Sequence, residues 1–155
     1  MSELSTLIDE LKSIYDGDAW HGPSLKEALA GLTAEQAAAR PVPGAHSIWE
    51  LALHIAAWKG VWARRLEGDP TSEPEEGDFP AITKTDDKSW GEALARLDGA
   101  QQKLLGAASE LNDSALKQKV AGADYTVEYM LRGAARHSVY HAGQISLLKR
   151  AFGRQ

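Results

Sequence analysis

The sequence contains no cysteine among its 155 residues. Disulfides, metal sites built from thiolates and a thiol nucleophile supplied by the protein are therefore excluded. No apolar run approaches the roughly 18 residues that a membrane-spanning helix needs. The acidic start, MSELSTLIDE, is unlike a secretory signal peptide. We therefore expect a cytoplasmic protein that is not inserted in a membrane, a compartment with which the missing cysteine agrees.

Basic charge is also scarce. The chain has 17 lysine and arginine residues against 22 acidic ones, which gives a net charge of −5 and a pI near 5.5. It shows no stripe of lysine and arginine of the kind that a phosphate backbone requires, so we expect no nucleic-acid partner. The length and the 43% hydrophobic content are those of one folded domain, which we expect to span 1–155.

Apolar residues recur every three or four positions in four long segments, which is the pattern of amphipathic helices. Capping boxes open two short helices and the second long helix. There is no alternating strand pattern. The sequence therefore predicts an all-α protein, a four-helix bundle with short extra helices between the first two long ones. The long segments are 3–15, 47–68, 89–111 and the one that follows Thr126, and the capping pairs are Ser24 and Glu27, Thr33 and Gln36, and Ser47 and Glu50.

The connection 67–87 is longer than most loops between bundle helices. It holds eight carboxylates, one lysine and three prolines. We favour the interpretation that it is a solvated crossover between two helices. The alternative is a lid, with Phe79 and Ile82 packing near a mouth of the bundle.

Two histidines, His137 and His141, lie four residues apart in the apolar stripe of the last long segment. Residues with this spacing lie about 40° apart around a helix and about 6 Å apart along it, so two imidazoles can converge on one cation. Such a pair more often only forms hydrogen bonds in a core. A third histidine, His54, lies in the inward stripe of the second long segment. One metal ion would satisfy all three imidazoles, and three neutral imidazoles are the ligand set of an open zinc site.

These residues carry a resemblance to a known family. The stretch SIWELALHIAAWKGVW, followed far downstream by RHSVYHAGQISLLKR, resembles the DinB superfamily and its YfiT-like members over nearly the whole chain. The histidine of the second helix falls on His54, and the fourth-helix motif H-x-x-x-H-x-G-Q falls on His137, His141, Gly143 and Gln144. The resemblance implies an up-down-down-up four-helix bundle, a homodimer and a divalent metal held by the three histidines. Zinc or nickel is the expected occupant after purification.

Characterised members of this family resemble metal-dependent transferases of low-molecular-weight thiols, and others resemble metal-dependent hydrolases. The resemblance therefore implies an enzyme that transfers a small thiol to an electrophilic small molecule. Because the chain has no cysteine, the thiol would arrive as a cosubstrate. Two alternatives stay open, namely a hydrolase that uses metal-bound water and a non-catalytic bundle that binds a metal or a ligand.

Four further residues are candidates for a pocket around the metal or for hydrogen bonds to its ligands. They are His21, Trp58, Tyr140 and Gln144. For His21 an exposed or backbone-bonded role competes, for Trp58 simple core packing, and for the other two packing or solvent exposure. Trp62 is expected in the core or in a dimer interface.

Overall fold

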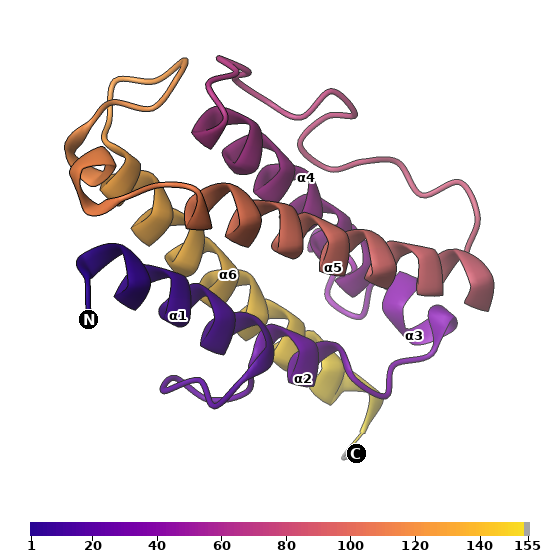
Figure 1. The fold of residues 1–155 in the computed structure, drawn as a ribbon. Helices are drawn as coiled ribbons and strands as arrows, with labels where there is room; N and C mark the ends of the chain where they lie inside the picture. The colour runs from indigo at the N-terminus through magenta and orange to yellow at the C-terminus, as the bar shows by residue number, and fades with distance from the viewer. Residues whose placement is uncertain (154–155) are drawn as a thin grey trace.

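The computed structural model describes residues 1–153. Its frame is four long helices, with two short helices between the first two of them (Figure 1). No β-strand occurs in residues 1–153, so the all-α class is confirmed. The long helices are α1 (Glu3–Asp16), α4 (Ile48–Leu66), α5 (Asp87–Ser109) and α6 (Val127–Lys149), and the shorter elements are α2 (Leu25–Leu29), α3 (Ala34–Ala38) and the 3₁₀ helices η1 (Asp113–Lys117) and η2 (Arg150–Phe152).

The helices begin at side chains that cap their free backbone N–H groups. All three predicted capping boxes form, at Ser24, Thr33 and Ser47, and the hydroxyl of Thr126 accepts from the N–H of Tyr129 at the start of α6. Helix α5 begins two residues earlier than predicted, because the carboxylate of Asp86 caps it. Each cap satisfies a donor that would otherwise have no partner in the helix, and each is worth about 1 kcal/mol.

The four long helices pack around an apolar interior. Helix α4 lies against α5 and α6, and α1 lies against the same two helices from the other side. The buried apolar residues form two clusters, one around Trp49, Leu97 and Ile145 and the other around Leu7 and Leu131. Along α6 the first cluster begins at Ala142 and the second ends at Ala135, so the segment that carries the two histidines lies between them.

The connection from α4 to α5 leaves the C-terminal end of α4 and runs back to the opposite end of the molecule, where α5 begins (Figure 1). Its first part is held to the C-terminal end of α4 by two arginines. Arg64 pairs with Asp69 and Glu75, and Arg65 donates to the carbonyl oxygens of Thr71 and Ser72. The segment is therefore attached to α4 rather than only solvated. No helix within residues 1–153 combines the length and the apolar character that crossing a membrane requires.

Candidate metal centre

Three histidines from two helices bring their side chains to one point. His54 projects from α4, and His137 and His141 project from successive turns of α6. The Nε2 atom of His137 lies 3.0 Å from Nε2 of His54 and 3.2 Å from Nε2 of His141. His54 and His141 are each 7% exposed. The inward positions that the helical spacing predicted for these three residues therefore agree with the structure.

Hydrogen bonds fix the proton on the outer nitrogen of two of these rings. The Nδ1–H of His54 donates to the carbonyl oxygen of Asp78 at 2.8 Å, and the Nδ1–H of His141 donates to Oε1 of Gln144 at 2.6 Å. Both acceptors are oxygens without a proton, so the proton of each neutral ring lies on Nδ1. The Nε2 lone pairs of His54 and His141 are thus free and point toward His137. This is the tautomer in which histidine binds a metal through Nε2.

The surroundings of the third ring, His137, show whether a proton or a metal cation better suits the space between the three Nε2 atoms. Its Nδ1 is buried and has no hydrogen-bond partner within residues 1–153. A proton on its Nε2 could serve only one of the two facing lone pairs well, whereas a cation accepts a lone pair from all three rings. Tetrahedral zinc with bonds of about 2.0 Å would separate its ligand nitrogens by about 3.3 Å, close to the two distances found here. The three imidazoles could hold a metal ion.

The electrostatics of the cluster favour the neutral form of two of its imidazoles, those of His137 and His141. Burial, together with the neighbouring His141 and His54, lowers the pKa of His137 to about 3. Burial also lowers the pKa of His141, against an opposing contribution from its hydrogen bond with Gln144. Neutral imidazole is the form that binds a metal, so the lowered pKa values favour binding at neutral pH.

The four predicted outer residues differ in their contact with the cluster. Gln144 holds His141, and the ring of Tyr140 lies edge-on to His141 with the centroids 5.0 Å apart. Trp58 reaches the cluster through Asp78, because its Nε1 donates at 2.7 Å to Oδ1 of Asp78, which lies 3.1 Å from Nδ1 of His54. His21 is exposed in the connection that follows α1, and no hydrogen bond or ring contact in residues 1–153 joins it to the cluster.

Two residues of the connection between α4 and α5 complete the surroundings of His54, and the sequence did not single out the first of them. Asp78 accepts from His54 through its carbonyl oxygen, and its Oδ1 lies 3.1 Å from the same Nδ1. The ring of Phe79 stacks on His54 with the centroids 4.3 Å apart and on His46 at 3.6 Å. A loop aspartate among eight carboxylates carries no periodic signal, so only the folded backbone reveals its position.

Trp62, the other tryptophan in this part of α4, is a core residue. It is 8% exposed, and its ring meets His137 edge-on with the centroids 5.1 Å apart. The core alternative of the sequence analysis is therefore the one that the structure supports. The ring packs against His137 and so helps to bury it.

A buried lysine lies near the cluster and was missed by the sequence analysis. Lys59 on α4 is 1% exposed, and its Nζ donates to Oγ of Ser138 at 3.1 Å. Burial alone lowers the pKa of Lys59 to about 7. Its setting in the apolar run IAAWKGVWA is a local hint, but its burial depends on how α1 and α6 surround it. A charged amine in the core requires a compensating partner, and here a single hydroxyl takes that role.

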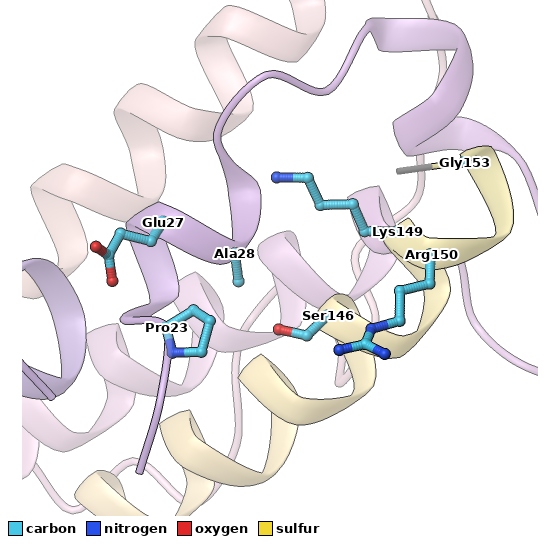
Figure 2. A pocket seen from close by; sticks show the side chains of 7 residues that line it. All are labelled: Pro23, Glu27, Ala28, Ser146, Lys149, Arg150 and Gly153. Atoms are coloured by element: carbon cyan, nitrogen blue, oxygen red, sulfur yellow. The ribbon is translucent and has the colours of Figure 1, made fainter. Parts of the chain in front are cut away.

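The molecule has a large hollow elsewhere. It has a volume of about 700 Å³ and lies between α2 and the C-terminal end of α6, with Pro23, Glu27, Ser146, Lys149 and Arg150 in its wall (Figure 2). None of the three histidines lines it.

A comparison with protein families identifies the same relationship as the sequence motifs. The family model of the DinB superfamily matches residues 19–145, which include all three histidines and most of the chain. No curated protein and no solved structure matches the chain.

Proposed function

The chain belongs to the DinB superfamily, and we propose that it is a metal-dependent enzyme that transfers a low-molecular-weight thiol to an electrophilic small molecule. The observation that carries the proposal is the convergence of three imidazole nitrogens, two of them with their protons fixed on the far side of the ring. The preference for thiol transfer over hydrolysis rests on the resemblance to characterised family members.

In this proposal His54, His137 and His141 hold a divalent metal, with zinc or nickel as the expected occupant. A bound metal lowers the pKa of a thiol or water that it contacts and so supplies a nucleophile at neutral pH. The chain's own residues orient the ligands, since Asp78 and Gln144 hold the outer nitrogens of His54 and His141. The packing of Phe79 and Trp62 against the rings keeps bulk water away from the cluster.

A screen for activity tests the reaction. The metal-loaded protein is incubated with a panel of electrophiles, with and without each common cellular thiol, and the products are followed by mass spectrometry. We expect an adduct that requires both the thiol and the metal. Turnover without any thiol would replace the proposal by hydrolysis. Tight metal binding with no turnover on any substrate would leave a non-catalytic metal-binding bundle.

We further infer that the helices follow the up-down-down-up order of the family within one domain. The long connection 67–86 supports this order, because its length lets α5 start at the end of the molecule where α4 starts. Short connections between all four long helices would instead favour neighbours that alternate in direction.

Self-association as a homodimer is also proposed. The outer side of α6 exposes Tyr129, Tyr140 and Leu147, at 63%, 65% and 69% exposure. Aromatic residues are enriched in interfaces between proteins, and large exposed apolar side chains gain from being covered. We expect light scattering at micromolar concentration to give twice the mass of the chain, and Leu147→Asp to shift the population toward monomer. A monomeric mass for the unmodified protein would contradict the proposal.

A further inference from the structure

His54 contacts the connection that follows α4, which is a surface loop. Surface loops are generally more mobile than the helices they join. Residues 77–82 of this connection pass over His54, with Asp78 and Phe79 as the points of contact. We define this stretch as the covering segment. It is the only neighbour of His54 described above that does not belong to a long helix.

Asp78 binds two side chains of α4 at once. Its carbonyl oxygen and its Oδ1 both lie near Nδ1 of His54, at 2.8 Å and 3.1 Å, and the same Oδ1 accepts from Nε1 of Trp58 at 2.7 Å. His54 and Trp58 are four residues apart and therefore adjacent on one face of the helix. The carboxylate bridges them, and this bridge sets the carbonyl oxygen in line with the imidazole.

Phe79 adds a packing contact to the polar one. Its ring lies between the imidazoles of His46 and His54, nearly parallel to both, with interplanar angles of 10° and 12°. Stacked pairs of this kind contribute roughly 0.5–1.5 kcal/mol each beyond the buried area. Together with Asp78, this ring leaves His54 only 7% exposed.

The covering segment begins where the strong anchors of the connection end. The preceding residues are held by arginines, with Arg64 bound to Asp69 and Glu75, and Arg96 bound to Glu76. Gly77 follows with a φ of 89°, in the left-handed region that glycine adopts without strain, and a side chain there would meet nothing within 4 Å. Backbone rotation at this residue can therefore lift the covering segment while the anchored part stays in place.

We propose that Asp78 is a positioning residue for the metal centre and that it ties closure of the covering segment to occupancy of the centre. The hydrogen bond to its carbonyl oxygen requires the proton of His54 on Nδ1, and this same tautomer presents Nε2 to the metal. A metal that selects the tautomer therefore favours the closed segment. Coupling between two binding equilibria is reciprocal, so the closed segment raises the affinity for the metal by the same factor.

Opening of the covering segment is then the step that admits a substrate. In the closed arrangement the ring of Phe79 stacks on His54, so a substrate that approaches His54 from this side meets that ring. The inference rests on the metal centre of the proposed function but not on the reaction that takes place there. It applies equally to a transferase, a hydrolase or a protein that only binds metal.

The experiment measures metal affinity in three variants. Cobalt is titrated into the metal-free protein and followed by its visible absorption, and zinc affinity is obtained by competition. We expect Asp78→Ala to bind both metals about 10–100-fold more weakly, the usual effect of losing an outer partner of a ligand. Asp78→Asn keeps an oxygen that can accept from Trp58 and is expected to bind more tightly than Asp78→Ala. Glu73→Ala removes one negative charge from the same connection and serves as the matched control, with unchanged affinity.

Hydrogen exchange supplies a readout that affinity alone does not give. In the unmodified protein, zinc is expected to slow amide exchange in the covering segment by about the same 10–100-fold factor, as reciprocity requires. In Asp78→Ala the exchange is expected to be fast with and without zinc. His137→Ala, which removes a ligand, serves as the control in which zinc changes nothing.

Two results would overturn the inference. One is an Asp78→Ala variant that binds metal as tightly as the unmodified protein or no more weakly than Glu73→Ala. The other is exchange in the covering segment that does not respond to zinc. Both differ from a failure of the proposed function, because an unmodified protein that binds no metal at all would remove the centre itself.

Discussion

His137→Ala is expected to release a divalent metal from the protein, with an affinity loss of a hundredfold or more. Nε2 of His137 lies within 3.2 Å of both other Nε2 atoms, so it is the ligand on which the other two converge. Losing it leaves two ligands where an open zinc site uses three, a larger change than the 10–100-fold loss that follows removal of an outer partner. His54→Ala and His141→Ala are expected to have similar effects.

Elemental analysis after loading with zinc and dialysis against metal-free buffer checks this expectation. His46→Ala is the matched control, because His46 stacks on Phe79 but contributes no nitrogen to the cluster. His21→Ala, at an exposed position, is a second control. Unmodified protein that emerges from dialysis without metal would refute a three-histidine site.

The pH dependence of metal binding follows from the lowered pKa values. With the ordinary imidazole pKa of about 6.5, metal binding would weaken as the pH falls through that value. Burial and the neighbouring rings lower the pKa of His137 to about 3, and burial lowers that of His141. At His137 and His141, protons therefore compete with the metal at a lower pH than they would at an ordinary imidazole. We expect zinc to remain bound at pH 6 and to be lost as the pH falls further, which a titration with an indicator dye can follow.

Lys59→Met is expected to stabilise the protein at pH 7 by roughly 4–5 kcal/mol, since one pKa unit corresponds to about 1.4 kcal/mol. The lysine is 1% exposed, and burial lowers its pKa from 10.5 to about 7. On folding, the amine therefore either loses its proton or keeps its charge and loses its hydration. Either change costs free energy. Methionine has a similar length and no charge, so it fills the same space without that cost.

The direction of the pH effect distinguishes this cause from a packing effect. A folded pKa below the unfolded one means that the unfolded chain binds more protons between pH 7 and 10.5, so stability rises with pH across this window. Below about pH 7 both states are protonated and the cost is constant. Urea denaturation at pH 7 and at pH 9.5 should show the rise in the unmodified protein and little of it in Lys59→Met.

Lys88→Met is the matched control for this prediction, because the side chain of Lys88 is 87% exposed. It is expected to change the free energy of unfolding by less than about 0.5 kcal/mol at either pH. A Lys59→Met variant less stable than the unmodified protein at pH 7 would contradict the account. It would mean that the hydrogen bond to Ser138 outweighs the desolvation of the amine.

The parts of the fold that the sequence predicts are those with a local cause. The capping box at Ser47 and the periodic apolar positions of α4 act within a few residues, so they can be recognised without a structure. The same periodicity placed His54, His137 and His141 on inward faces. Asp78 is different, because its role depends on where a long irregular connection passes over α4. No periodicity describes that path.

Lys59 shows a second limit of sequence patterns. In a helical pattern a lysine is assigned to the outward face. The neighbours Trp58 and Gly60 do not indicate that this position faces inward. Helix α6 packs on α4, and α1 lies across the interior of the bundle, so together they enclose a position that a two-helix contact would leave open. Its Nζ lies 5.8 Å from the centre of the Tyr15 ring on α1 and 3.1 Å from Ser138 on α6. Only the assembled helices determine that this side chain is buried.

The separation of His54 from His137 along the chain also sets when the cluster can exist during protein synthesis. The two residues are 83 positions apart, and ribosomes add roughly 5–20 residues per second, so roughly 4–17 s pass between their synthesis. For that time His54 has no partner ring, and α4 and α5 can pair while their faces for α6 are still uncovered. A metal cannot assist these early steps. In the proposed metal centre, the metal would have to enter after the last helix is synthesised, so the finished chain and not the growing one would depend on the metal supply.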